Sequence, residues 1–225
     1  MPEDRARPQR VGRERDGASP AMLVIDWDGT ATERDTLHMA IERFGDVGVF
    51  VALEEDLGRT LTLREVIAAE MATITAPFDE VLGWLLENVR LRRGFAELVE
   101  AQDPLIVSAG FHELIEPVLE REGIHARVAA NHVTAHPAGW RAEFIDVPVC
   151  DECGERCKRG VVEGLGRFAY AGDGVSDRCV SLAAERRFAR AGLARWLDEQ
   201  GVAYEPFGDL CDVLSAMEAQ SSRRS

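Results

Sequence analysis

Lysine is almost absent from this 225-residue chain: of its 26 lysine and arginine residues, only Lys158 is a lysine. Long hydrophobic runs are missing too, and none approaches the roughly 20 apolar residues that a transmembrane helix needs. Residues 1–20 lack the apolar segment of a secretory signal peptide. We therefore expect a cytoplasmic protein without membrane contact.

Positive charge is in deficit, because 40 aspartates and glutamates leave a net charge of −14. Such an acidic balance disfavours nucleic acid as the main partner, although residues 1–20 carry five arginines. We expect these 20 residues to form a disordered tail and residues 216–225 a flexible C-terminus. The oligomeric state is not indicated by any pattern in the sequence.

The most informative stretch is residues 21–30, which read Ala-Met-Leu-Val-Ile-Asp-Trp-Asp-Gly-Thr. Its five leading apolar residues predict a short buried strand, and Asp26 and Asp28 follow at the carboxyl end. Ligands of open α/β sheets bind at that edge. Buried carboxylates are costly unless they are paired or bound to metal. The segment therefore suits a site for a cation and a ligand, or else a plain turn.

Three later segments favour a site over a turn. Two of them directly follow apolar runs: Ser108-Ala109-Gly110 follows residues 104–107, and Gly172 to Asp177 follows residues 168–171. The third is Lys158, which lies between these two runs. Together they offer a hydroxyl, an ammonium and a second acid pair, Asp173 and Asp177. This set suits a phosphoryl group beside a divalent metal. The alternative is that these residues have only local structural roles, since serine and aspartate are also common as turn and helix-cap residues.

Lys158 indicates a position that arginine cannot fill, because the chain uses arginine everywhere else. An ammonium is a compact point charge with rotatable donors, whereas a guanidinium is a wide planar fork. Lysine can therefore bridge a carboxylate and a phosphoryl oxygen in a crowded site. The alternative is a surface lysine that survives by chance.

In this order the four segments resemble the motifs of the haloacid dehalogenase (HAD) superfamily of phosphatases. Within it the chain looks like the phosphoserine-phosphatase-like branch. It is most similar to the methionine-salvage phosphatases that act on 2-hydroxy-3-keto-5-methylthiopentenyl-1-phosphate. Softer matches to that group are residues 60–65, residues 91–95, Asn131-His132 and the cysteines just before Lys158.

The resemblance implies a chemical role for three aspartates. Asp26 would be the nucleophile that forms an aspartyl-phosphate. Asp28 would protonate the leaving alcohol and then activate the water that hydrolyses the intermediate. Mg²⁺ would bind Asp26, the backbone carbonyl of Asp28, and Asp173, because this ion prefers oxygen ligands.

The same resemblance implies a phosphate-binding set of Ser108, Ala109, Gly110 and Lys158, with the N-terminus of the next helix facing the anion. Two further residues would support the site: Thr30 behind the reacting groups, and Asp177, which would hold a metal-bound water or orient Lys158.

The fold that the resemblance implies is α/β, with a Rossmann-like core built on a parallel sheet and an inserted helical cap. Residues 21–32 and 91–215 would form the core, and residues 33–90 the cap that closes over the site. Expected helices are 35–44, 47–57, 62–74 and 78–90 in the cap, and 94–102, 111–122, 158–165 and 176–184 in the core. Expected strands at 21–25, 104–107 and 168–171 alternate with the core helices, as in a parallel sheet, and residues 126–149 predict a hairpin.

Two sets of side chains near the cap are candidates for substrate contact. Those that could line the cap are Glu33, Asp35, His38 and Arg43. Arg92 and Arg93 could attract an anionic substrate, although a solvated helix face is the favoured interpretation for both.

Three closely spaced cysteines, Cys150, Cys153 and Cys157, are compatible with zinc, which usually takes four nitrogen or sulfur ligands. His132 or His136 could be the fourth. A reversible disulfide between Cys153 and Cys157 is another option, and ordinary reduced thiols in a loop are the favoured interpretation. The remaining two cysteines are expected in the core, on apolar helix faces: Cys179 and Cys211.

We therefore predict a Mg²⁺-dependent phosphatase for a small phosphorylated metabolite, with the methionine-salvage phosphoketone as the preferred substrate. The alternative enzyme is a phosphoserine phosphatase. The alternative of another class is a non-catalytic metal- or ligand-binding module with the same fold. A dinucleotide-binding dehydrogenase is disfavoured, because Asp-Trp-Asp-Gly-Thr stands where a G-x-G-x-x-G turn would be needed.

Overall fold

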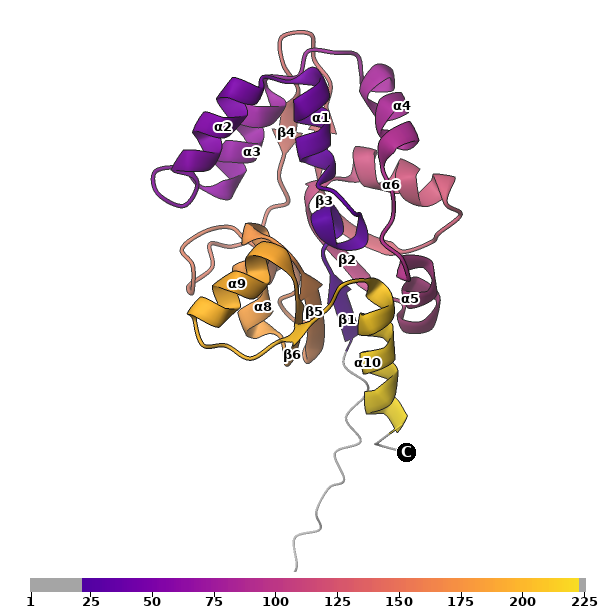
Figure 1. Ribbon diagram of the computed structural model, residues 1–225. Helices are drawn as coiled ribbons and strands as arrows, with labels where there is room; N and C mark the ends of the chain where they lie inside the picture. Colours follow the sequence, from indigo (N-terminus) through magenta and orange to yellow (C-terminus); the bar gives the residue numbers. More distant parts are fainter. Residues whose placement is uncertain (1–21, 223–225) are drawn as a thin grey trace, which may run out of the picture.

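The computed structural model describes residues 22–222, and side chains up to residue 219 (Figure 1). The tail predicted over residues 1–20 lies outside the described residues. No helix within residues 22–222 combines the length and apolar character that crossing a bilayer requires.

Within residues 22–222, seven strands form one sheet in the order β4-β3-β2-β1-β5-β6-β7. All neighbours are parallel except β4, which runs antiparallel to β3. The strands are β1 (Met22–Ile25), β2 (Leu105–Phe111), β3 (Arg127–Thr134), β4 (Arg141–Glu143), β5 (Phe168–Gly172), β6 (Arg186–Ala189) and β7 (Glu205–Pro206). Because β1 lies mid-sheet between β2 and β5, the residues after it stand at the centre of the carboxyl edge.

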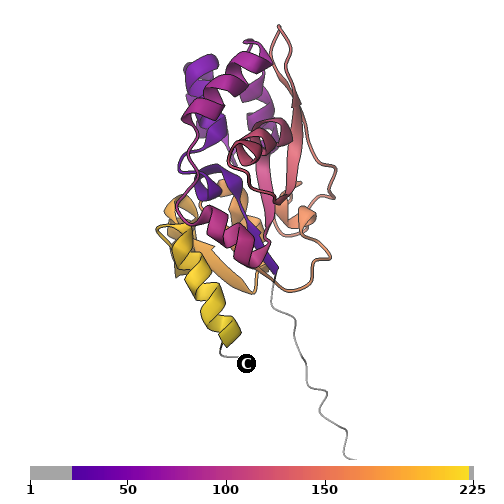
Figure 2. The same cartoon turned by 90° about the vertical axis from the view of Figure 1, so that its right-hand side faces the viewer.

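The sheet is buried on both faces, as its continuous apolar strands predict. In β1, Leu23 and Ile25 pack into the main core, whereas Val24 points to the opposite side and joins a second cluster with Tyr170. The main core includes side chains of α5 (Phe95–Gln102), α6 (His112–Arg121) and α10 (Leu210–Ser222). The other face is covered by α7 (Lys158–Val161) and α8 (Arg178–Ala183), with α9 (Ala191–Glu199) beside α8. Figure 2 shows α5 and α10 side by side on their face.

Of the five α-helices between β1 and β2, all but α5 lie beyond the carboxyl ends of the central strands (Figure 1). They are α1 (Thr36–Phe44), α2 (Val47–Asp56), α3 (Leu63–Met71) and α4 (Phe78–Asn88). We call residues 33–90 the helical insert. Local signals start these helices: Asp35 caps α1, and Thr62 and Glu65 form a capping box on α3. The hairpin predicted at 126–149 is β3–β4, and the indole nitrogen of Trp140 beyond its turn donates to the Ala76 carbonyl of the insert over 2.9 Å.

Predicted boundaries were least accurate around the site. The strand expected at 104–107 continues to Phe111, so the segment from Ser108 to Gly110 lies inside β2 rather than after it. The helix expected at 158–165 ends at Val161, because Gly164 and Gly166 adopt positive φ angles that no helix contains. The helix expected at 176–184 is divided into a 3₁₀ turn, η2 (Val175–Asp177), and α8.

Between residues 185 and 215 we predicted only that Cys211 lies on a helix, whereas the structure has β6, α9, β7 and the start of α10. Strand β6 escapes detection because it begins with Arg186-Arg187 and has only two fully buried residues. A flexible C-terminus was expected over 216–225; α10 continues through residues 216–222, and Met217 is buried against the core. The α/β fold with a largely parallel sheet covered on both faces is confirmed.

Candidate active site

Asp26 stands at the centre of the carboxyl edge. Its backbone N–H donates to the carbonyl of Ala171 over 2.9 Å, which extends the pairing of β1 with β5 by one residue. The chain then leaves the sheet through a turn segment, η1 (Trp27–Ala31), in which Gly29 has a φ of +73°. The predicted strand that ends at two carboxylates is therefore confirmed.

Lys158 lies at the start of α7, and its side chain is buried. The ammonium contacts Asp26 Oδ1 and donates to Asp177 Oδ1 over 2.7 Å. A surface lysine that survives by chance is thus excluded. The segments that carry these three residues are far apart in sequence and converge on one point, as predicted.

Asp177 has no free acceptor capacity. Its Oδ2 accepts from the backbone N–H groups of Asp173 and Gly174, at 2.8 and 2.9 Å. Its Oδ1 accepts from Lys158 and, over 2.6 Å, from the buried hydroxyl of Tyr170. Asp177 therefore makes both kinds of contact that we considered for it. It closes the turn after β5 as a local hydrogen-bond acceptor, and it orients the Lys158 ammonium.

Asp28 is held between the insert and β2. Thr36, the first residue of α1, directs both its N–H (2.8 Å) and its hydroxyl to Asp28 Oδ1. On the other side, the Ser108 hydroxyl lies 3.4 Å from Asp28 Oδ2 and accepts from the N–H of Gly110 over 2.8 Å. Ser108 caps no helix, because it lies inside β2 with its hydroxyl turned toward the carboxylates.

Asp173 faces the turn after β1. Thr30 donates its hydroxyl to Asp173 Oδ1 over 3.1 Å, the kind of support that we expected of it. A Cβ atom at Gly29 would lie 2.9 Å from Asp173 Cγ, closer than carbon atoms approach. Glycine at this position therefore lets the turn pass directly against the carboxylate.

Burial and mutual repulsion raise the pKa of most of these acids. Burial, followed by the charge of Asp177, holds the pKa of Asp26 well above its usual range, although Lys158 opposes the shift. Burial and then Asp35 raise the pKa of Asp28 to about 7, and burial and then Asp177 raise that of Asp173 to about 6. The site thus gathers more negative charge than one ammonium compensates.

A divalent cation would relieve this repulsion, and the donor set fits one. Oxygen atoms of Asp26, Asp173 and Asp177 lie within 4.8 Å of one another. Since both oxygens of Asp177 already accept hydrogen bonds, the available carboxylates are those of Asp26 and Asp173. Hard oxygen donors of this kind suit Mg²⁺.

Two arginines hold the turn after β1 in place. Arg92 is buried and donates to the backbone carbonyls of Gly29, Thr30 and Thr32 at 2.8 to 3.0 Å. Arg190 donates to the Gly29 carbonyl as well, over 2.7 Å. The solvated face that we favoured for Arg92 is therefore wrong, because its buried guanidinium donates to the carbonyls of this bent backbone segment.

Arg93 fits the solvated interpretation. Its side chain is 78% exposed, and its guanidinium pairs with Asp209 over 2.9 Å. One of two adjacent arginines thus supports the site, while the other faces solvent.

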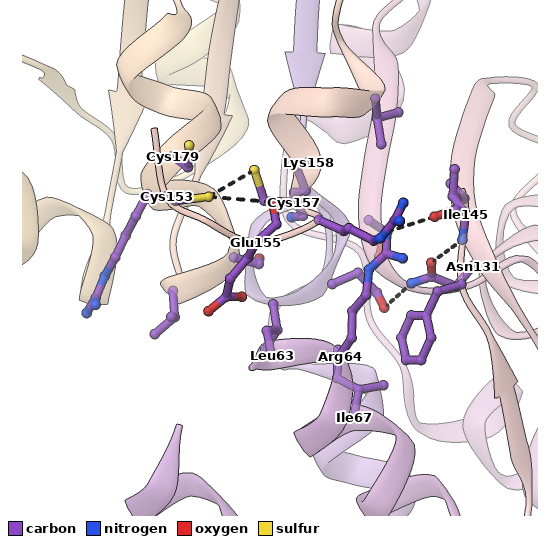
Figure 3. Close-up of a pocket in the computed structure, with 18 of the residues that line it drawn as sticks. Leu63, Arg64, Ile67, Asn131, Ile145, Cys153, Glu155, Cys157, Lys158 and Cys179 are labelled. Carbon is purple, nitrogen blue, oxygen red and sulfur yellow. Dashed lines mark hydrogen bonds between the residues drawn. The ribbon is translucent and has the colours of Figure 1, made fainter. Parts of the chain in front are cut away.

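Two neighbouring cavities open between the insert and the sheet. The smaller, about 220 Å³, reaches Ser108 and Lys158 and is walled by Leu63, Ile67 and Phe144 (Figure 3). The larger, about 400 Å³, reaches the acid cluster of the core. The residues that line both are Leu63, Ile67, Ala109, Val175 and Ser176. The two cavities are therefore adjoining parts of one cleft.

Of the four residues expected to line the cap, Glu33, Asp35 and His38 border the larger cavity, whereas Arg43 does not. Arg43 instead lies over the ring of Phe44. Prediction from sequence missed several groups that the structure adds to the site: Thr36, Glu70, Tyr170 and Arg190. Of these, only Thr36 had a sequence signal, since it follows the Asp35 helix cap.

The three predicted cysteines lie beside Lys158, but their fourth partner is Cys179. The expectation that Cys179 is a core residue is wrong: it is only half-buried, and its sulfur faces Cys150 over 3.7 Å. Neither candidate histidine joins them. His132 contacts Glu113 over 2.8 Å and stacks on His112, and His136 accepts from the N–H of Ala138.

An open, mostly parallel sheet that collects carboxylates at its carboxyl edge defines a Rossmann-like α/β protein with a ligand site at that edge. The family model for haloacid dehalogenase-like hydrolases matches residues 23–181, well over half of the chain. This chain is a member of that HAD-like hydrolase family.

Named relatives and solved structures agree with this membership. The chain is 25% identical, over 87% of its length and 96% of the relative's, to a 2-hydroxy-3-keto-5-methylthiopentenyl-1-phosphate phosphatase from Exiguobacterium sp.. It is 27% identical to the protein of the same name from Geobacillus kaustophilus, over 88% of this chain and 95% of the other. The crystal structure of phosphoserine phosphatase from T. onnurineus is similar in fold, with a TM-score of 0.64 at 18% identity, over 88% of this chain and 94% of that one.

Proposed function

We propose that the protein is a Mg²⁺-dependent phosphatase that hydrolyses a small phosphomonoester through an aspartyl-phosphate on Asp26. The observation that carries the proposal is the convergence of Asp26, Asp28, Ser108 and Lys158 on one buried point at the carboxyl edge of the sheet. A non-catalytic module would have no need to bury an ammonium against a carboxylate poised to react.

In the first step, a carboxylate oxygen of Asp26 forms a bond to phosphorus, and the bond from phosphorus to the ester oxygen breaks. Asp28 gives its proton to the departing alkoxide. In the second step, water attacks phosphorus, gives its proton back to Asp28, and the bond to Asp26 breaks. A pKa of about 7 allows Asp28 to be the acid and then the base at neutral pH.

The remaining residues bind and position the phosphoryl group. The Ser108 hydroxyl and the Lys158 ammonium would contact its oxygens. Mg²⁺ would be held by the carboxylates of Asp26 and Asp173 and the backbone carbonyl of Asp28, and it would neutralise charge on the phosphoryl oxygens. Thr30 fixes the orientation of Asp173.

The helical insert is proposed to act as the cap. Its helix α3 contributes Leu63 and Ile67 to both cavities, so the organic part of a substrate would lie between α3 and the core. Closure of this cap would keep water out of the first step.

The apolar walls of the smaller cavity favour the methionine-salvage phosphoketone as the substrate, because Leu63, Ile67 and Phe144 would contact its methylthio end. Phosphoserine is the less favoured alternative, although Arg64, Glu155 and Arg156 also line this cavity and would pair with its carboxylate and ammonium. The relatives named for the phosphoketone support the same choice. Comparing kcat/KM for the two compounds tests it: we expect the phosphoketone to be preferred by at least about 100-fold, worth about 2.7 kcal/mol. A preference for phosphoserine, or a flat profile over phosphorylated metabolites, would contradict the choice.

Asp26→Asn tests the activity itself. The amide is a poor nucleophile, so turnover of a generic aryl phosphate should fall by about 10³-fold or more, some 4 kcal/mol of barrier. The circular dichroism spectrum should be unchanged. Asp46→Asn is the matched control, because Asp46 only caps α2 and asparagine caps equally well. Unchanged turnover in Asp26→Asn would refute the proposal and favour the non-catalytic module.

A further inference from the structure

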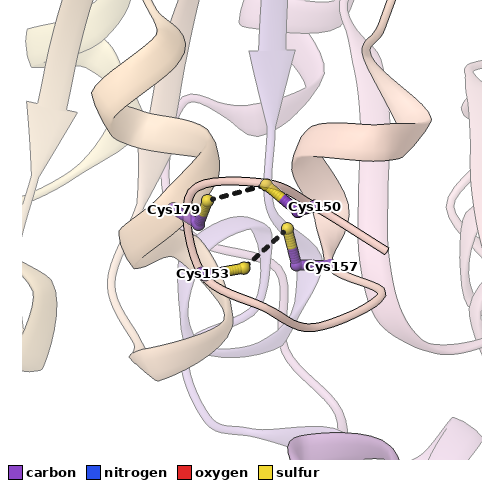
Figure 4. Close-up of side chains that lie close together, drawn as sticks. All are labelled: Cys150, Cys153, Cys157 and Cys179. Atoms are coloured by element: carbon purple, nitrogen blue, oxygen red, sulfur yellow. Dashed lines mark hydrogen bonds between the residues drawn. The ribbon is translucent and has the colours of Figure 1, made fainter. Parts of the chain in front are cut away.

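Four cysteine sulfurs form a compact cluster beside the phosphate-binding lysine (Figure 4). Cys150 and Cys179 are 3.7 Å apart, Cys153 and Cys157 are 3.5 Å apart, and all four sulfurs lie within 4.8 Å of one another. Five cysteines occur in the whole chain, so four of them meet at one place.

These separations are those of a tetrahedral metal site. Zinc–sulfur bonds of about 2.3 Å place the sulfurs of a Zn–Cys₄ tetrahedron about 3.8 Å apart. A disulfide requires sulfur atoms about 2.05 Å apart, far shorter than either pair here. The cluster is therefore already close to the arrangement that a four-coordinate ion needs.

The backbone presents the ligands in the manner of a metal-binding loop. Cys150 and Cys153 are separated by two residues, and Gly154 follows with a φ of +74°. The N–H of Gly154 donates to the Cys150 carbonyl over 2.8 Å, and the N–H of Cys150 donates to the Glu155 carbonyl over 2.9 Å. This tight loop turns two thiols toward Cys157, at the start of α7, and toward Cys179, in α8.

We propose that Cys150, Cys153, Cys157 and Cys179 bind one structural Zn²⁺ ion. Such a site closes with four protein ligands and has no open position for chemistry. Thiolates select Zn²⁺ over Mg²⁺, so this site is separate from the acid cluster in both place and ligand preference. The inference does not depend on the proposed phosphatase activity.

The position of the cluster indicates which part of the structure a bound ion would stabilise. Cys157 directly precedes Lys158, and Cys179 stands two residues after Asp177. A shared ion would tie the start of α7 to α8 and thereby fix the two segments whose side chains form the pair between Lys158 and Asp177. Most residues of the loop at 150–157 are exposed, so burial alone contributes little to fixing it.

Metal analysis of the full-length protein tests the assignment. We expect about one zinc per chain in protein purified without chelator, and the same content in Cys211→Ser, the control outside the cluster. Cys179→Ser and Cys153→Ser should each lose the zinc and lower the thermal midpoint. If a variant fails to fold, wild-type protein stripped with chelator and refilled with Zn²⁺ alone provides the same comparison.

Cobalt(II) provides a readout that does not involve activity. Added to stripped wild-type protein, it should give the intense visible absorption of tetrahedral thiolate coordination, and added to stripped Cys179→Ser it should give a weaker, altered band. Absence of zinc together with failure to take up Zn²⁺ or Co²⁺ would overturn the proposal. So would stoichiometric iron, or a mass that is about 4 Da low because two disulfides have formed.

Discussion

Lys158 donates a hydrogen bond to Asp177 over 2.7 Å, and the same buried ammonium contacts Asp26. Asp177 and Asp26 outweigh the opposing effect of burial and hold the pKa of Lys158 above its usual range. Burial alone would raise the pKa of Asp177, but Lys158 and hydrogen bonds keep it below its usual value. Each group is therefore charged in the folded protein because the other is present.

Lys158→Met should destabilise the protein by roughly 3–5 kcal/mol at pH 7, because removing one partner of a buried ion pair leaves the other uncompensated. Urea unfolding followed by circular dichroism measures the change. Lys158→Arg keeps the charge but replaces a compact ammonium by a wide fork, so it should restore only part of the stability. A Lys158→Met protein that unfolds at the wild-type urea concentration would contradict this account of the pair.

Arg92 and Arg93 form a natural matched pair for mutation. Arg92→Ala would remove this donor from the carbonyls of Thr30 and Thr32 and leave Gly29 with Arg190 alone, and we expect a loss of about 2–4 kcal/mol. Arg93→Ala removes an ion pair on a largely exposed side chain, which is worth about 0–1 kcal/mol. Equal losses in urea unfolding would show that the turn does not depend on the Arg92 guanidinium.

Glu70 gives the protein a specific dependence of stability on pH. It is buried in the wall of the larger cavity, its Oε1 has no hydrogen-bond partner, and burial, followed by the charge of Glu54, raises its pKa from 4.5 to about 8. The folded state therefore holds a proton that the unfolded state releases. Its contribution to stability is complete below pH 4.5 and is lost as the pH rises through 8.

Glu70→Gln should therefore show a smaller fall in thermal midpoint between pH 5 and pH 9 than the wild type shows. Other buried acids titrate in the same window, but they contribute equally to both proteins. Glu100→Gln, on an exposed position, should retain the wild-type difference. Parallel pH profiles for Glu70→Gln and the wild type would mean that Glu70 is ionised at neutral pH in the folded protein.

The residues that could be predicted from sequence are those whose signal is local. Asp26 and Asp28 directly follow an apolar strand, and Asp173 follows another, so parallel strands bring them to one edge. Lys158 stood out by its rarity, although α7 itself is only one turn. These signals sufficed to predict the parallel sheet and the convergence of the four segments.

What escaped prediction depends on contacts between distant segments. Arg92 and Arg93 are identical neighbours in sequence, and only the path of the turn at residues 29–32 decides that the first is buried. Cys179 has the spacing of an apolar helix face, yet the packing of α8 beside α7 turns its sulfur toward Cys150. Nothing in the sequence distinguishes Tyr170 from other residues of a buried strand. Its part in the site follows from the hydrogen bond that its hydroxyl donates to Asp177.

Gly29 and Gly58 separate the cost of backbone strain from the cost of a contact at the site. Both have a positive φ, +73° and +71°, but a Cβ at Gly58 would meet nothing within 4 Å, whereas one at Gly29 would press on Asp173. Gly58→Ala should cost about 1–2 kcal/mol, the price of a left-handed alanine. Gly29→Ala should cost more and, under the proposed function, should also raise the Mg²⁺ concentration needed for half-maximal turnover, because Asp173 must move. Unfolding in urea and Mg²⁺ titration of turnover measure the two effects. Equal stability losses with unchanged Mg²⁺ dependence would show that the close approach of Gly29 to Asp173 is not required.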